Sequence, residues 1–340
     1  MTRLPLEYLT TYDADDFFAD HAPCVREFHC PELNYSLFSS WIPQLHSITV
    51  TYPLSLGDLF SLLAITPLLE SLKVGQTVLD LLDTENQTRR IHLPTLKRID
   101  LENRFLPCLS ILEQVTPSPQ CTLFLTITHE ELRDLTGAEL DRLKAILVQY
   151  SQGQPNLKRM ESLCLHVGPR KLSIFAPSRT LYPQMIFRIK ILSRFNLPSD
   201  FFPSILSTFS SCNFLPVTVL EFIVFPGFSS KIASFLLSLP SIEILHVNDD
   251  ALRLFLDLIE SHPGALPLLH TLIWEGTVFE KVNDCAAIDQ YLLPILESRK
   301  CNEAPIKILD LVKCELKNAN ELKYFDRMSG MKHLVRAKKT

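Results

Sequence analysis

Cysteine and histidine have the widest chemical range of the residues in this chain, and their spacing argues against a metal centre. The nine cysteines include no C-x-x-C pair, and Cys285, Cys301 and Cys314 are sixteen and thirteen residues apart. Structural zinc sites use closely spaced ligand pairs, so these thiols are not expected to bind zinc. Cys30 stands where an apolar residue recurs in similar segments, and a buried thiol is a poor nucleophile.

Histidines and sequence motifs offer no clearer catalytic site. His29, His46, His166, His246 and His270 lie on or beside predicted strands, and we expect them to be surface or partly buried residues. The phosphate-binding, dinucleotide-binding, zinc-protease and serine-hydrolase motifs are absent from the sequence. The sequence therefore predicts no catalytic residue, no metal and no cofactor. An enzyme whose site leaves no motif is an alternative.

Polar side chains that alternate with apolar ones along the predicted strands indicate a different chemistry, the binding of a partner. Because side chains alternate faces along a strand, these polar positions share one face of a sheet. Their charges are mixed, which favours a protein partner over a polyanion, and a merely solvated face is the alternative. The predicted partner-binding residues are Lys73, Arg98, Asp100, Glu102, His166, Arg188, Lys190, His246, Asn248 and Glu275.

The elements that position these residues recur along the chain. The unit P-x-L-x-x-L-x-V, seen in "TPLLESLKV" after Pro67, is repeated in one register after Pro23, Pro43, Pro94, Pro240 and Pro267. Two copies are one residue tighter, after Pro216 and Pro305, and weaker copies follow Pro119, Pro155 and Pro183. Most intervals between these prolines lie near the period of leucine-rich repeats, about 20–29 residues.

Helical stretches follow the strands. Ser55 with Asp58 forms a loose capping box, and Thr136 with Glu139 forms a full one, each ahead of an apolar stripe. The same pattern predicts a helix that begins after the cap residue Asn318 and ends at Gly330. The repeated leucine positions, including Leu72, Val74, Ile99, Leu101, Leu245, Val247 and Trp274, are predicted to be core.

This order predicts an α/β leucine-rich-repeat solenoid. We expect a curved horseshoe with a parallel sheet on its concave face and helices on its convex face. Residues 1–340 would form a single array, with 1–22 as a partial first repeat and 318–340 as a C-terminal capping helix and basic tail.

Composition limits the compartment and the class of partner. The formal net charge is −5, and 46% of the residues are hydrophobic. No strongly basic balance indicates nucleic acid, and no apolar run reaches the ~20 residues that span a bilayer. Without a signal peptide, the cysteines are expected to be reduced, which places the chain in the cytoplasm or nucleus.

The run "FFADHAPCVREFHCPELNYSLFSSWIPQLHSITVTYPLSLGDLFSLLAITPLLESLKV", residues 17–74, carries a family resemblance. It resembles the F-box-associated leucine-rich-repeat proteins of mushroom-forming fungi, and "LPTLKRIDL" and "CTLFLTI" fit the same pattern. In that family an amino-terminal F-box docks onto the Skp adaptor of a cullin ubiquitin ligase, and the repeats select substrates. The resemblance thus implies a substrate-selecting repeat region.

The F-box itself is expected to be missing from this chain. "LPLEYL", Leu4 to Leu9, is similar to an F-box opening, but the next residues lack the expected helices and W-R element. We interpret Leu4–Leu9 as the strand of a partial first repeat, so a Skp-type adaptor is expected only if an F-box lies upstream. The predicted function is a non-enzymatic protein-recognition module, with a repeat scaffold or regulator outside ubiquitination as the alternative.

Overall fold

A computed structural model describes most of the chain in two compact units. The described residues are 8–10, 26–30, 41–51, 53–75, 90–129, 135–152, 160–177, 185–210, 214–228, 232–275, 292–311 and 332–334. Unit 1 comprises Met1–Asn156 with Phe187–Pro198, and unit 2 comprises Leu157–Ile186 with Ser199–Thr340. The single array over 1–340 stays a prediction.

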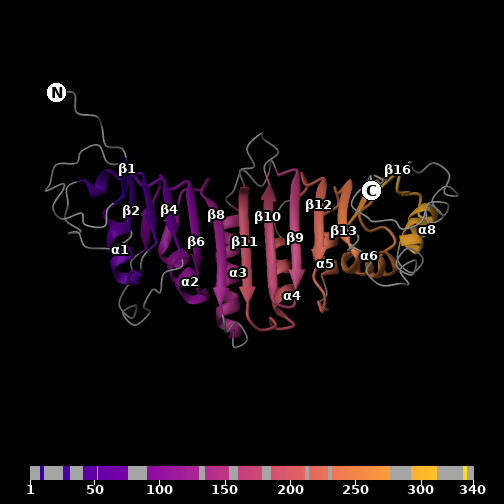
Figure 1. Cartoon of the computed structure of the whole chain (residues 1–340), viewed down its shortest axis with the longest axis horizontal. Coiled ribbons are helices and arrows are strands. Elements are labelled where there is room, and N and C mark those ends of the chain that lie inside the picture. The colour runs from indigo at the N-terminus through magenta and orange to yellow at the C-terminus, as the bar shows by residue number, and fades with distance from the viewer. Residues whose placement is uncertain are drawn as a thin grey trace, which may run out of the picture. The chain divides into compact units, whose positions relative to one another are not determined.

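Unit 1 is a parallel sheet, with helices in several of the connections between its strands (Figure 1). Its strands pair in the order β1 (Tyr8–Thr10), β2 (Glu27–Cys30), β3 (Ser47–Val50), β4 (Ser71–Val74), β6 (Arg98–Asn103), β8 (Thr122–His129) and β11 (Met185–Ser193). Its helices are η1 (Ile42–Gln44), α1 (Leu56–Ala64), α2 (Phe105–Gln114) and α3 (Gly137–Gln152). A second, smaller parallel pair, β5 (Ile91–Leu93) with β7 (Val115–Pro117), was not predicted from the sequence.

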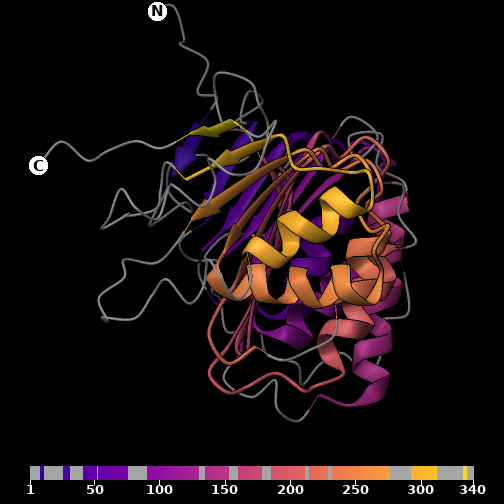
Figure 2. The same cartoon turned by 90° about the vertical axis from the view of Figure 1, so that its right-hand side faces the viewer.

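Unit 2 repeats the plan with one exception. Its strands pair in the order β10 (Lys171–Pro177), β9 (Ser162–Gly168), β12 (Val219–Val224), β13 (Ile244–Asn248), β14 (Thr271–Glu275), β15 (Ile308–Asp310) and β16 (Lys332–Leu334). Its helices are α4 (Phe201–Ser210), α5 (Ala233–Leu237), α6 (Asp249–Ser261) and α8 (Leu293–Cys301). Figure 2 shows α6 and α8 on one side of the neighbouring strands.

The exception is the β9–β10 hairpin, which is antiparallel, whereas the other paired strands of unit 2 run parallel. Only Pro169 and Arg170 separate the two strands, and so short a loop can join only antiparallel neighbours. The expectation of a wholly parallel sheet is wrong at this point, while the α/β leucine-rich-repeat architecture is confirmed.

In five of the described repeats the repeated proline is the second residue of a tight turn. The amide of Leu69, two residues after Pro67, donates to the Thr66 carbonyl at 3.2 Å. Proline presets the backbone angle that this turn position requires, and the turn ends at a buried residue, here Leu69, two residues before the strand begins. Equivalent bonds are donated by the amides of Leu45, Leu96, Ile242 and Leu269.

The carbonyl of the residue that follows the turn accepts hydrogen bonds from the next repeat. Glu70 is the third residue after Pro67, and its carbonyl accepts the amides of Lys97 and Arg98, at 2.8 and 3.0 Å. The carbonyls of His46, Glu243 and His270 accept two amides in the same way. In the tighter copy after Pro216 the acceptor is the carbonyl of Thr218, which is the second residue after the proline instead of the third. The one-residue difference deduced from the sequence is therefore present in the structure.

Burial alternates along the strands as the sequence predicts. Leu72, Val74, Ile99, Leu101, Leu245, Val247 and Trp274 are buried, which confirms the predicted core. The backbone amides of Asp58 and Glu139 donate to the side chains of Ser55 and Thr136. The Thr136 amide also donates to the Glu139 carboxylate, which confirms the full capping box there, whereas Ser55 and Asp58 form the looser version that the sequence predicts. The predicted helix at 318–330 lies outside the described residues, and Lys332–Leu334 of the predicted tail forms β16 by pairing with β15.

Candidate functional site

We call the face of each sheet that carries the polar strand residues the open face. The ten predicted partner-binding residues all lie on strands, at positions that alternate with buried apolar residues. They fall into two groups, one in each unit: Lys73, Arg98, Asp100, Glu102, Arg188 and Lys190 in unit 1, and His166, His246, Asn248 and Glu275 in unit 2.

In unit 1 a single carboxylate lies between two guanidinium groups. Arg98 Nη2 donates to Asp100 Oδ2 at 3.1 Å, and Arg188 Nη2 lies 3.6 Å from Asp100 Oδ1. The Asp100 side chain is only 15% exposed, so the carboxylate is largely withdrawn from water between the two more exposed arginine side chains. The residues Lys73, Arg98, Asp100, Phe124 and Arg188 are called the arginine cluster below.

Phe124 forms the floor of the arginine cluster, and it was not among the binding residues predicted from the sequence. It lies opposite Asp100 on β6 and opposite Arg188 on β11, yet its ring is 5% exposed. Arg98 Cζ lies 4.3 Å from the ring centroid and Arg188 Cζ lies 5.8 Å from it. The ring face attracts both guanidinium groups and holds them over it. The alternation in "TLFLT" places Phe124 on the open face, which is the signal that could have identified it.

In unit 2 histidine and glutamate alternate across neighbouring strands. His166 Nε2 lies 2.8 Å from Glu221 Oε1, and His246 Nε2 lies 2.9 Å from Glu275 Oε2. His246 Nδ1 lies 3.8 Å from Glu221 Oε2, so one imidazole faces two carboxylates. The residues His166, Glu221, His246 and Glu275 are called the His–Glu ladder below.

The ladder changes the acidity of its central carboxyl group. The hydrogen bonds from His166 and His246 hold the pKa of Glu221 well below its usual range, against the opposing effect of partial burial. Glu221 appears among the outward residues of the strand pattern, but its partners come from segments 55 and 25 residues away, which the sequence cannot pair.

Asn248 has a structural role that the prediction did not include. Its amide oxygen accepts the backbone amides of Val224 and Ala251, at 3.0 and 3.1 Å, and its amide nitrogen donates to the Val224 carbonyl at 2.7 Å. The side chain therefore caps α6 and joins β13 to β12, which leaves it little capacity to bind a partner.

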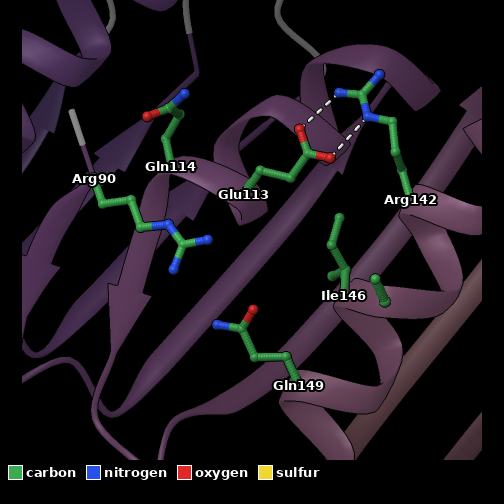
Figure 3. Close-up of a pocket in the computed structure, with 7 residues that line it drawn as sticks. Arg90, Glu113, Gln114, Arg142, Ile146 and Gln149 are labelled. Atoms are coloured by element: carbon green, nitrogen blue, oxygen red, sulfur yellow. Dashed lines mark hydrogen bonds and ion pairs between the residues drawn. The ribbon is translucent and has the colours of Figure 1, made fainter. Parts of the chain in front are cut away.

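A pocket of about 410 Å³ lies on unit 1 near α2 and α3 (Figure 3). Arg142 and Glu113 form a two-pronged ion pair there, with Nε–Oε1 and Nη2–Oε2 distances of 2.7 Å. The other lining residues are Arg90, Gln114, Ala145, Ile146 and Gln149. Because the carboxylate is neutralised and no histidine, cysteine or serine is among these seven residues, the lining offers no activated nucleophile.

The described thiols are mostly inert. Cys108, Cys121 and Cys164 are buried, and burial raises the pKa of each to about 12. A thiol with so high a pKa has almost no thiolate at neutral pH. Within the described ranges no three histidine, cysteine or acidic side chains come close enough to hold a metal ion. No helix in the same ranges is long and apolar enough to cross a membrane.

Comparison with known proteins gives a distant structural similarity and no match in sequence. No family model matches the chain, and no curated protein is significantly similar to it in sequence. A solved structure of the leucine-rich repeat-containing protein LegL7 from Legionella pneumophila is 13% identical, with 80% of this chain and 90% of that one covered, at a TM-score of 0.28.

Proposed function

We propose that the chain is a non-enzymatic protein-recognition module that contacts its partner through the open faces of its sheets. The observation that carries this proposal is the concentration of partly exposed charged side chains, several of them in ion pairs, at strand positions from several repeats. Adjacent strands lie ~4.8 Å apart, so these side chains form a continuous surface within each unit. Repeat proteins commonly use such a surface for binding.

The experiment that tests this proposal maps the partner onto the chain. A photo-cross-linking amino acid is placed at Arg98 or His246 on the open faces, and at Asp141 on α3 as the matched control. Each captured protein is identified, purified and bound again to the unmodified chain. We expect one protein to cross-link from the open-face positions and to rebind. Cross-linking from Asp141 alone would refute the open faces as the contact.

A second candidate function, substrate selection for an F-box-type ubiquitin ligase, is favoured by the residues of the 17–74 run. In this case a Skp-type adaptor would be reached through an F-box outside the repeats. We expect the 340-residue chain to show no measurable binding to a purified Skp-type adaptor. Binding in a simple pulldown would instead assign an F-box role to Leu4–Leu9. If the chain is a scaffold outside ubiquitination, even a longer form of the chain should not bind the adaptor.

A further inference from the structure

We propose that the arginine cluster binds the carboxylate side chains of an acidic segment in the protein partner. This inference deepens the proposed function and depends on it. It starts from the balance of charge on strands β4, β6, β8 and β11. At the open-face positions of these strands the cations outnumber the carboxylates. The cations are Lys73, Arg98, Arg188 and Lys190, and the carboxylates are Asp100 and Glu102.

The hydrogen-bonding capacity of the two arginines is only partly used. A guanidinium group has five N–H donors in a planar fork that fits a carboxylate. Arg98 and Arg188 share the one Asp100 carboxylate, through Nη2 atoms at 3.1 and 3.6 Å. The Nε of Arg188 is shielded from solvent and has no hydrogen-bond partner among the described residues. Both side chains are still 30% or more exposed, so a ligand can reach their Nη atoms.

Phe124 makes the cluster ready for such a ligand. The ring lies beneath both guanidinium groups, and Asp100 holds their ends. Less side-chain freedom is therefore lost when a carboxylate binds, which raises affinity without any new contact. The nearly buried ring also keeps water from one side of each cation, which strengthens the attraction to an incoming anion.

The geometry fits an extended peptide. Arg98 and Arg188 are on strands two positions apart in the sheet, which separates their backbones by ~10 Å, and acidic side chains two residues apart on an extended segment are ~7 Å apart. Long arginine side chains bridge the difference. A polyphosphate fits less well, because the carboxylates of Asp100 and Glu102 lie on the same open face and the protein has a formal net charge of −5.

The test uses the full chain and a fluorescent peptide of alternating glutamate and serine, with a glutamine–serine peptide as its matched control. Anisotropy measures binding to the wild type, to the double variant Arg98→Glu/Arg188→Glu, and to Arg90→Glu/Lys300→Glu, which makes the same charge change at exposed positions outside the cluster. We expect the first variant to weaken binding about 10-fold or more and the second by less than about 2-fold.

Phe124→Leu keeps the charges and removes the aromatic ring beneath them, so it should weaken binding of the acidic peptide several-fold. Thermal melting of each variant checks that it is folded before its affinity is compared. The inference is overturned if the acidic peptide binds no better than the glutamine peptide, or if both double variants lose affinity equally. It is also overturned if an oligonucleotide of matched charge binds more tightly through the same arginines. Failure of this inference with cross-linking still confined to the open faces would leave the proposed function standing.

Discussion

Tyr150 on α3 carries a hydroxyl group that the fold buries without using. Its side chain is 4% exposed, the oxygen has no hydrogen-bond partner among the described residues, and burial raises the pKa of the phenol. Phenylalanine would keep the ring and remove the unpaired group. We expect Tyr150→Phe to be neutral or to stabilise the fold by up to about 1 kcal/mol, measured by urea unfolding.

The matched control for Tyr150→Phe is Thr66→Val, because Thr66 is equally buried and its hydroxyl is used. Thr66 Oγ1 donates towards the carbonyls of Leu62 and Leu63, both at 3.2 Å. Its loss should cost about 1 kcal/mol. If Tyr150→Phe proves as costly, the phenol has a partner outside the described residues.

Glu221 in the His–Glu ladder should make stability depend on pH. Its pKa in the folded protein lies below its ordinary value of 4.5, because His166 and His246 stabilise the carboxylate. The stabilisation is therefore complete above the ordinary pKa and is lost progressively as the pH falls below it. We expect Glu221→Gln to lower stability at neutral pH by about 1 kcal/mol, reduced from the value for a charged hydrogen bond because the side chain is a third exposed.

Unfolding in urea at several pH values between neutrality and about pH 3 measures this effect. The wild type should lose stability more steeply than Glu221→Gln on acidification. Glu297→Gln, at an exposed position on α8, serves as the control and should follow the wild type. Parallel curves for wild type and Glu221→Gln would show that the ladder does not stabilise the carboxylate.

At the scale of elements, Arg299 on α8 fastens the helix to the turn before β14. Its side chain is 1% exposed, and it donates to the carbonyls of Ala265, Leu266, Leu269 and Ala304, at distances between 2.9 and 3.0 Å. Burial lowers the pKa of the guanidinium group, so the four carbonyls offset a real desolvation cost. We expect Arg299→Met to cost about 3–5 kcal/mol in urea unfolding, because four carbonyl acceptors, three of them buried, lose their donor.

Neighbouring residues supply the controls for Arg299. Lys300→Met removes an exposed cation one residue away and should change stability by less than about 0.5 kcal/mol. Arg299→Lys keeps the charge but cannot reach four carbonyls at once, so it should be nearly as harmful as methionine. Equal, mild effects at 299 and 300 would contradict a fastening role.

The elements that could be predicted from the sequence are those set by local chemistry. Proline turns, capping boxes and alternating leucines depend on neighbours within a few residues, and the strands and core residues they predict are in place. The β9–β10 hairpin was missed because Lys171–Pro177 follows no proline copy. The pairing of Glu221 with His166, and the stacking of Arg98 on Phe124, depend on the register of separate strands. Position on the open face could be predicted from alternation, but these contacts could not.

At the scale of the whole molecule, a repeat protein is stabilised mainly by contacts between neighbouring repeats. Leu72 on β4 is fully buried, and it lies in register with Ile48 on β3 and Ile99 on β6. We expect Leu72→Ala to cost about 2–5 kcal/mol, whereas Lys73→Ala, one residue along on the open face, should cost less than about 0.5 kcal/mol.

Hydrogen exchange followed by mass spectrometry tests whether that loss stays local. Because each repeat relies on its neighbours, the amides of β3, β4 and β6 should exchange faster in Leu72→Ala, and the increase should fall off along unit 1 towards β8 and β11. Lys73→Ala should leave the same amides unchanged. A uniform increase over all the strands of unit 1 would mean that the unit unfolds as one cooperative block, and equal losses at 72 and 73 would mean that the strand register is wrong.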